Sequence, residues 1–349
     1  MGMVQHYPAV APPTAPVCSV CVANYNGAAL LVDCLDSVLA QQGGFNIEII
    51  VHDDASTDDS LALLRDRYPQ VEVLASGQNV GYCISNNRMA AHARGEYILL
   101  LNNDAALNID ALATFLREVE SQEMQGILTL PQYDWKTGEL VDRGCLLDPF
   151  CNPIPNLDPV RKEVAYVIGA CLWCPRKLWS ALGGFPDWME SLAEDLYLCS
   201  VARLRNIPVS ALSSSGYRHR QGATFGGNRA SNARLSTSMK RRRLSECNKT
   251  RTLVILTPGL AMWPLLAAHL VALTLEGLAL CAISRNAALW REVYGRAITS
   301  PIRDRSLLCS ERRLQQSKRK ISSFRWFAST RWQLRKVSMA LRYGIPKIY

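Results

Sequence analysis

The residues best suited to chemistry follow a short apolar run in the first third of the chain. Residues 98–101 contain no polar side chain, which is typical of a strand buried on both faces of a sheet, and Asn102, Asn103 and Asp104 follow directly. In an open α/β sheet, ligands bind beyond the carboxyl ends of the strands. A carboxylate held there is well placed to bind a hard divalent cation. The alternative is that these residues only cap the helix expected from about Ile109.

The segments before this run alternate between strand and helix patterns. The expected strands are 17–23, 47–51, 71–74 and 97–101, and helices are expected at 28–40, from the segment after Asp58 to about Tyr68, and from Gly81 to about Arg94. This alternation with short connections predicts a parallel sheet with helices on both faces. The polar loops that follow the strands should therefore line one edge, forming a crevice of nucleotide size.

Two of these loops carry groups that can recognise a nucleotide. Asp53 follows the second strand, and an ionised carboxylate can accept hydrogen bonds from a base or ribose. The residues after it, 54–58, also fit a plain helix N-cap. No glycine-rich phosphate loop of either standard spacing is present in the sequence, which disfavours a dinucleotide-binding fold and a P-loop ATPase.

Charge divides the chain into two parts. Residues 240–349 contain 22 Lys/Arg and 5 Asp/Glu, a net charge of +17. Residues 1–239 have a net charge of −8, and the two parts together give +9. An acidic body with a basic tail indicates an anionic partner surface, either membrane or nucleic acid. Residues 1–16 are rich in Pro and Ala and lack a signal-peptide pattern, so we expect a disordered arm.

The 12 cysteines are expected to be reduced thiols. Two pairs, Cys18 with Cys21 and Cys171 with Cys174, have the C-x-x-C spacing of metal sites. Both pairs fall in predicted strands, where residues i and i+3 point to opposite faces. Buried small apolar side chains are therefore the better interpretation than a zinc site.

In their order and spacing, the polar motifs resemble those of family 2 glycosyltransferases, and more closely the bacterial rhamnosyltransferase-like group. The matching segments are residues 24–27, 53–58, 79–81, 86–87 and 100–104. The resemblance implies a GT-A fold and an inverting transfer from a nucleotide-diphosphate sugar, with dTDP-rhamnose as a candidate donor. It also implies a divalent metal, Mn²⁺ or Mg²⁺.

The same resemblance assigns roles to single residues. It places Asp53 at the nucleotide base and Asp104 at the metal, with His219 as a second metal ligand. Asn102 stands where many relatives carry a first aspartate, so the site has one strong carboxylate ligand. The residues expected to bind the nucleotide sugar are Ala23, Tyr25, Asp53, Asn79, Gly81, Asn87, Asn102 and Asn103.

A later segment resembles the second half of the family signature, with a Gly-Gly-Phe turn at 183–185 followed by Glu194 and Asp195. An inverting transfer needs a base within hydrogen-bond reach of the acceptor hydroxyl, and paired acids can raise one another's pKa. Asp195 is the expected base, with Glu194 assisting. The alternative is that both acids only favour a helix N-terminus. Residues 224–228 are expected to close over the donor as a lid.

The tail contains an apolar stretch, 253–283, in which only His269 and Glu276 are ionisable. It is long enough to span a bilayer, but Pro258 and Pro264 interrupt it and both flanks are basic. We expect a helix lying on the cytoplasmic face of the plasma membrane. One alternative is that this helix packs on the body. Another is that it forms an oligomer interface; the sequence does not predict the oligomeric state. Binding of nucleic acid by the basic, aromatic tail is a weaker alternative.

The sequence thus predicts an α/β protein with a GT-A type, mostly parallel sheet flanked by helices and a basic, partly apolar helical extension. Its expected parts are an arm (1–16), a catalytic domain (17–239) and a membrane-associating tail (240–349). The expected function is an inverting glycosyltransferase that acts on a lipid-linked or polymeric cell-surface glycan. The alternative is a weakly active or inactive homologue that binds nucleotide sugar as an assembly subunit.

Overall fold

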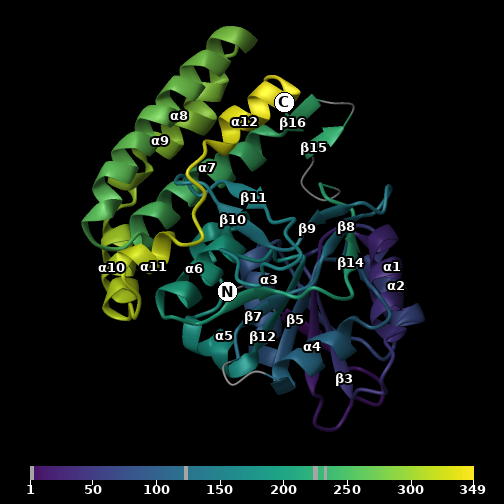
Figure 1. The fold of residues 1–349 in the computed structure, drawn as a ribbon. Coiled ribbons are helices and arrows are strands. Elements are labelled where there is room, and N and C mark those ends of the chain that lie inside the picture. The colour runs from purple at the N-terminus through teal and green to yellow at the C-terminus, as the bar shows by residue number, and fades with distance from the viewer. Residues whose placement is uncertain (1–3, 122–124, 223–226, 232–233) are drawn as a thin grey trace.

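The fold is built on a mixed sheet of eight strands with helices on both faces, as the computed structural model shows for residues 4–121, 125–222, 227–231 and 234–349 (Figure 1). In spatial order the strands are β1 (Val4–Tyr7), β4 (Glu72–Ser76), β3 (Ile47–Asp53), β2 (Cys18–Asn24), β5 (Tyr97–Leu101), β12 (Cys171–Pro175), β7 (Ile127–Thr129) and β13 (Val209–Ala211). The six helices of this part are α1 (Ala28–Leu39), α2 (Ser60–Arg67), α3 (Tyr82–His92), α4 (Ala111–Ser121), α5 (Arg176–Leu182) and α6 (Glu194–Leu204).

The two faces of the sheet are covered by different helices. Side chains of α1, α2 and α4 share one hydrophobic cluster, and those of α3, α5 and α6 share the other. Alternate residues of β2 divide between them, since Val20 and Val22 belong to the first cluster and Cys21 to the second. The predicted parallel core, β4-β3-β2-β5, is confirmed.

Beyond β5 the sheet is no longer parallel. Strand β12 pairs antiparallel with both β5 and β7. An apolar run extends from Val164 to Trp173, but strand β12 begins only at Cys171. The start of the run instead contacts β13, where the Val164 N–H donates to the Val209 carbonyl over 3.0 Å. An apolar run alone does not distinguish a strand from a buried loop.

The prediction of a disordered N-terminal arm is wrong for residues 4–7. They form β1, which pairs antiparallel with β4 at the sheet edge. The following segment also contacts the body, since the Val10 amide donates to the Pro69 carbonyl and the Arg94 guanidinium to the Pro13 carbonyl. A composition rich in Pro and Ala could not reveal this pairing, because an edge strand draws its stability from its neighbour.

The cysteine pairs lie as the strand geometry predicted. Cys18 and Cys171 face one hydrophobic cluster, whereas Cys21 and Cys174 face the other, and all four are free and buried. The two cysteines of each C-x-x-C pair therefore cannot bind the same ion.

Three small sheets complete the fold. They are β6 (Ala105–Leu107) with β14 (Tyr217–His219), β8 (Gln132–Asp134) and β9 (Leu140–Asp142); β10 (Cys145–Leu147) with β11 (Pro153–Pro155); and β15 (Gly227–Ser231) with β16 (Arg234–Thr237) and β17 (Lys347–Ile348). The first of these brings His219 beside the end of β5, because β14 pairs with β6, which follows Asp104 directly.

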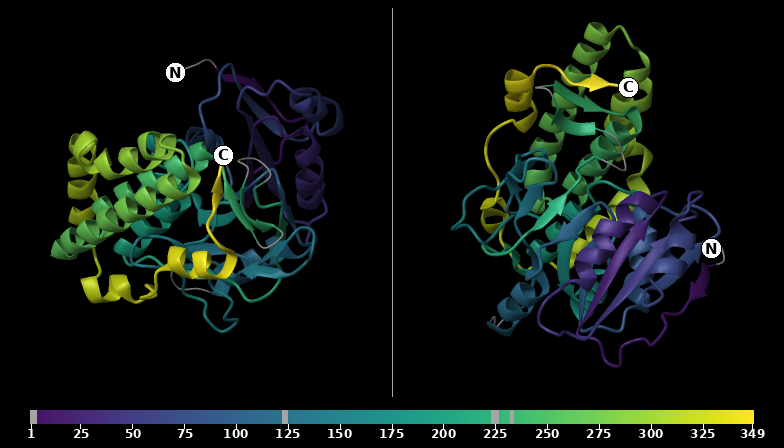
Figure 2. Two further views of the ribbon diagram at one scale, coloured as in Figure 1. Left: turned by 90° about the horizontal axis from the view of Figure 1, so that it is seen from above. Right: turned by 90° about the vertical axis from the view of Figure 1, so that its right-hand side faces the viewer.

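The tail is not a separate part beginning at residue 240. Its helices are α7 (Met239–Leu256), α8 (Met262–Ser284), α9 (Gly295–Arg303), α10 (Arg305–Ser317), α11 (Ser323–Phe327) and α12 (Arg335–Tyr343), with short turns at Gly259–Ala261 and Trp290–Tyr294. Helix α7 lies against the body (Figures 1 and 2), and Leu253 and Ile255 share the cluster that contains Leu100 and Leu172 of the sheet. The boundary predicted at 240 therefore cuts through one hydrophobic core.

The apolar stretch 253–283 is not one helix. Helix α7 ends at Leu256 and α8 begins at Met262, because Pro258 cannot continue α7, whereas Pro264 lies in the first turn of α8 and is tolerated there. By length and composition, Gly259–Ser284 is apolar enough to cross a membrane; its most apolar 18-residue window has a mean hydropathy of 2.0 and is 22% buried.

Candidate functional site

Asp53 lies in a polar network at the carboxyl ends of three strands. The Asn24 amide donates to Asp53 Oδ2 over 3.0 Å, and the Ser56 backbone N–H donates to Asp53 Oδ1 over 2.9 Å. The Asn103 amide donates in turn to Asn24 Oδ1 over 2.8 Å. Asn24, which the sequence analysis did not assign to the site, therefore joins Asp53 of β3 to Asn103 after β5.

A glycine makes this network possible. A Cβ at Gly27 would lie 2.3 Å from Asn103 Nδ2 and 2.4 Å from Asn24 Oδ1, so no larger residue fits without moving both amides. The sequence motif at 24–27 is thus explained by a close approach of the turn to Asn103.

The loop after β4 is held by Asp54. Its carboxylate accepts from the Val80 N–H over 2.7 Å and from the Gly81 N–H over 2.9 Å. Burial raises the pKa of Asp54, while these two bonds act to lower it. Gly81 adopts φ +90° as the N-cap of α3, and Asn79, two residues earlier, is exposed.

The remaining residues predicted to bind the nucleotide sugar divide into two groups. Ala23 is half-buried at the end of β2 and Tyr25 is exposed just beyond it, so both lie at the predicted edge. The Asn87 amide instead contacts the Gly-Gly-Phe turn, donating to the Phe185 carbonyl over 2.7 Å and accepting from the Phe185 N–H over 3.0 Å. Asn87 therefore positions that turn.

Asp104 and His219 face one another at the centre of the site. Asp104 Oδ1 lies 3.1 Å from His219 Nε2, and both residues are buried. The carboxylate oxygen nevertheless has no hydrogen-bond partner within the described residues. The two residues predicted as metal ligands are thus brought together.

The surroundings of His219 decide which ring nitrogen carries the proton. Gln132 Nε2 donates to Asp142 over 3.2 Å, so Gln132 Oε1 faces the ring, where it lies 3.0 Å from His219 Nδ1 and also accepts from Tyr217. Nδ1 therefore donates to Gln132, and in the neutral imidazole the lone pair of Nε2 faces the carboxylate.

In that neutral form, His219 Nε2 and Asp104 Oδ1 are two ligand atoms that could hold one cation. Ligands at about 2.1 Å and at right angles on an octahedral ion are about 3 Å apart, which agrees with the separation here. The oriented imidazole and the unpartnered carboxylate oxygen fit a divalent cation, with imidazole favouring Mn²⁺ over Mg²⁺.

A chain of contacts joins this centre to the acidic pair. The Tyr82 hydroxyl lies 2.9 Å from Asn102 Oδ1 and 3.2 Å from the Gly169 carbonyl. The Gly169 N–H donates to Asp195 Oδ2 over 3.0 Å. Tyr82, which the sequence did not reveal, therefore connects the end of β5 with the start of α6. Asn102 acts here as a hydrogen-bond acceptor.

The acidic pair differs in environment. Burial and the neighbouring Asp195 charge together raise the pKa of Glu194 to about 8. Burial also raises the pKa of Asp195, but backbone N–H groups act to lower it. One Glu194 oxygen has no partner within the described residues. The Arg241 guanidinium of α7 lies close enough to lower the pKa of both acids.

The loop before the pair is strained and is fastened by α7. Glu190, Leu192 and Ala193 have φ angles of 59°, 69° and 71°, in a backbone region that residues other than glycine rarely adopt. The Asn248 amide donates to the carbonyls of Met189, Ser191 and Leu192 over 2.9–3.0 Å. The tail therefore positions the acidic pair.

Two arginines beside His219 do not face the cation site. Arg220 donates to Asp33 over 2.5 Å and stacks 3.4 Å from the Trp135 ring centre. Arg218 is exposed and directly precedes His219 on β14, so the two side chains point to opposite faces of that small sheet. Of the predicted lid, residues 224–226 lie outside the described residues.

Part of the chain matches a known protein family. Residues 19–179 match the model of glycosyl transferase family 2. A poly(ribitol-phosphate) β-glucosyltransferase from Bacillus spizizenii is 31% identical over 168 residues, which cover 47% of this chain and 25% of the relative. Chondroitin synthase from Escherichia coli is 30% identical over 133 residues, covering 37% of this chain and 19% of the relative. The chain thus spans a quarter or less of these two relatives.

Solved structures support the fold. A mannosyltransferase from Pyrobaculum calidifontis, in complex with GDP-Man and Mn²⁺, superposes with a TM-score of 0.52 at 17% identity and covers 89% of both chains. GalNAc-T7 with UDP, GalNAc and Mn²⁺ gives a TM-score of 0.54 at 15% identity, covering 69% of this chain and 48% of the other. At these identities the likeness concerns the fold alone.

Proposed function

Because residues 19–179 form a glycosyl transferase family 2 domain, we propose that this protein transfers a sugar, with inversion, from a nucleotide-diphosphate donor to a polymeric or lipid-linked glycan. The observation that carries the proposal is the buried pair of Asp104 and His219, whose Oδ1 and Nε2 atoms lie 3.1 Å apart. The relatives named as glucosyltransferase and synthase support a glycan acceptor.

Each part of the site has a role in this reaction. Asp53, held by Asn24 and Ser56, keeps its remaining lone pairs for the nucleoside. Asp104 and His219 would hold a divalent cation, which when bound offsets the charge of a diphosphate leaving group. Asp195 accepts the proton of the acceptor hydroxyl, since its two backbone hydrogen bonds fix its orientation.

Nucleotide binding tests the proposal most directly. We expect one of UDP, dTDP and GDP to bind with Mn²⁺, and Asp104→Ala and His219→Ala to abolish the effect of Mn²⁺. Asp36→Asn is the control, because Asp36 is half-exposed and pairs with Arg67. Absence of binding by all three nucleotides, or unchanged Mn²⁺ dependence in Asp104→Ala, would refute the site.

Transfer assays then address the donor and the base. dTDP-rhamnose belongs in the donor panel because the motifs resemble the rhamnosyltransferase-like group. Asp195→Asn should keep nucleotide affinity and lose transfer, as expected of a base. Donor hydrolysis without acceptor separates an active enzyme from a homologue that only binds nucleotide sugar, since the latter would show none.

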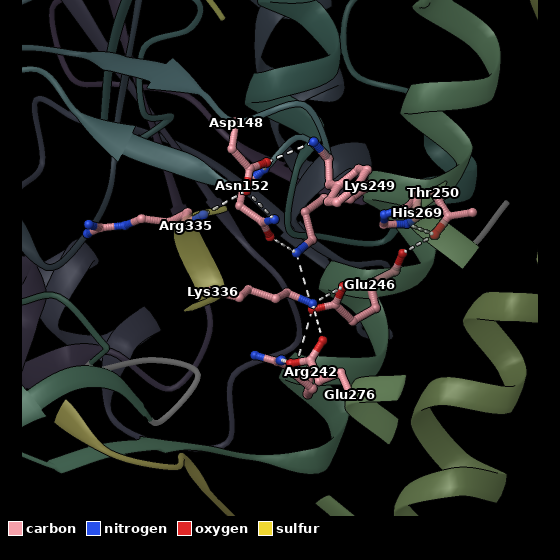
Figure 3. A network of polar contacts seen from close by, with 11 residues as sticks. Asp148, Asn152, Arg242, Glu246, Lys249, Thr250, His269, Glu276, Arg335 and Lys336 are labelled. Atoms are coloured by element: carbon pink, nitrogen blue, oxygen red, sulfur yellow. Dashed lines mark hydrogen bonds and ion pairs between the residues drawn. The ribbon is translucent and has the colours of Figure 1, made fainter. Parts of the chain in front are cut away.

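We further propose that the outer face of α8 lies on the cytoplasmic surface of an anionic membrane. The inner stripe of α8 packs on α7, and its polar members find partners in the tail. His269 lies 2.9 Å from Thr250, and Glu276 is bound by Arg242 and Lys336 (Figure 3). The exposed face carries large apolar residues with 54–64% of their surface accessible: Trp263, Val271, Leu275, Leu278 and Ile283.

The charge of the surrounding helices favours lipid as the occupant of this face. Exposed Arg285 ends α8, and residues 240–349 carry 22 basic and 5 acidic groups. We expect the protein to sediment with vesicles containing anionic lipid, and Leu275→Glu with Leu278→Glu to abolish this. A concentration-dependent dimer that the same substitutions dissolve, without vesicle binding, would instead identify a second copy as the occupant.

A further inference from the structure

Three metal-binding side chains converge at the sheet edge opposite β13, away from the site described above. His6 Nε2 of β1 and His92 Nε2 of α3 each lie 2.5 Å from Glu72 Oε1 of β4. The potential ligand atoms all lie within 4.8 Å of one another. The two imidazole rings meet edge to face, with centroids 4.9 Å apart.

The strand register explains this convergence. His6 pairs with Leu74, and Glu72 lies two residues before Leu74, so all three side chains leave the same face of the sheet. Helix α3 covers that face, and its Met89 shares a cluster with Leu74. His92 lies one turn beyond Met89 and therefore reaches the same point.

The cluster is separate from the Asp104 site. β1 and β5 are the first and fifth strands in the order β1-β4-β3-β2-β5. Glu72 also begins its strand, whereas the polar network of the other site lies where the parallel strands end. The inference therefore does not rest on the proposed function.

The chemistry of the three donors selects the ion. Two imidazoles and one carboxylate, with an open position, are a common ligand set for Zn²⁺, whose bonds to nitrogen are about 2.0–2.1 Å long. Nitrogen-rich sites bind Zn²⁺ far better than Mg²⁺. The Glu72 side chain is 10% exposed, whereas those of His6 and His92 are 44% and 38% exposed, so an ion can enter from solvent.

We propose that His6, Glu72 and His92 form a Zn²⁺ site that fastens the edge strand β1 to α3. Only four residues of β1 pair with the sheet. A bound ion joins β1 to two elements that lie more than 60 residues further along the chain. Because the ion binds the folded chain, the free energy of unfolding increases with the logarithm of the ion concentration once this exceeds the dissociation constant.

Zinc binding by the untagged full chain tests this proposal. The protein is stripped with a chelator, and Cys309→Ser serves as the background because Cys309 is the exposed thiol among the described cysteines. Equilibrium dialysis should find one Zn²⁺ per chain, and Co²⁺ should give a tetrahedral absorption spectrum. Zn²⁺ should also raise the thermal midpoint.

Substitutions locate the ion. His6→Ala and His92→Ala should each weaken Zn²⁺ affinity at least tenfold and abolish the thermal shift. Gln5→Ala, on the same strand but the opposite face, should leave both unchanged. The proposal is overturned if the stripped protein binds no Zn²⁺, which would leave a hydrogen-bonded His-Glu-His cluster, or if both histidine variants bind Zn²⁺ as the background does.

Discussion

Asn248 provides the sharpest test of how the tail supports the acidic pair. Its two amide N–H groups serve three carbonyls of the loop before Glu194, and Asn248 is fully buried. A buried hydrogen bond contributes about 0.5–1.5 kcal/mol, and an abandoned buried polar group costs about 1–3 kcal/mol. We therefore expect Asn248→Ala to lower the free energy of unfolding by about 2–3 kcal/mol.

The strain in the same loop makes the functional effect larger than the stability effect. Residues Glu190, Leu192 and Ala193 are each in the left-handed region, at about 1 kcal/mol or more apiece. Without the Asn248 clamp the loop relaxes, and Asp195 loses its position. Transfer should fall at least tenfold, while Mn²⁺-dependent nucleotide binding persists because Asp104 is not on this loop.

Urea unfolding and transfer rates measure the two effects. Thr252→Val is the matched control, because Thr252 is on the same helix, is 2% exposed, and its hydroxyl has no partner within the described residues. That variant should be as stable as the wild type. Adding Ala193→Gly to Asn248→Ala should recover about 1 kcal/mol. A change below about 0.5 kcal/mol in Asn248→Ala, or unaltered transfer, would refute the reasoning.

Three further outcomes are expected. Because the pKa of Glu194 is raised to about 8, the folded chain holds a proton that the unfolded chain releases, so the free energy of unfolding should fall as pH rises from the ordinary carboxyl range to about 8. Urea midpoints should show this loss, and Glu194→Gln should make them less dependent on pH. Gly27→Ala forces Asn103 to move and should weaken nucleotide affinity at least tenfold in a titration. Arg241→Gln removes a charge that lowers the pKa of the acidic pair, so the acidic limb of the transfer–pH profile should shift to higher pH.

Each of these has a control. Arg243→Gln removes a charge from the same helix turn and should leave the pH profile in place. Gly44→Ala adds a Cβ with nothing within 4 Å; its φ of +63° makes the variant less stable, but nucleotide affinity should be unchanged. A wild-type midpoint that does not fall relative to Glu194→Gln between about pH 5 and pH 9 would contradict the assignment of a buried, protonated carboxyl.

The local sequence pattern predicted the site residues that lie at the ends of strands. Asp53 and Asp104 follow short apolar runs, and the carboxyl ends of parallel strands meet at one edge, so their proximity follows from the fold class. The cysteine pairs were also predictable, because the period of a strand fixes which face each side chain takes.

The supporting residues could not be predicted in this way. Tyr82, Gln132 and Asn248 act through contacts with residues 20, 87 and up to 59 positions away in sequence. Each side chain is ordinary in its own helix or strand, and only tertiary packing gives it a role. Edge strand β1 was missed for the same reason, since its partner β4 is far along the chain.

The clamp formed by Asn248 has a consequence for how this protein can diversify. The family match ends at residue 179, but the acidic pair, His219 and the helix that fastens the strained loop all come later. A recombination event that joined the first 239 residues to the tail of a related enzyme would separate the loop from its clamp. Residues 189–256 should therefore be inherited as one block, and working chimaeras should have their crossover points outside it.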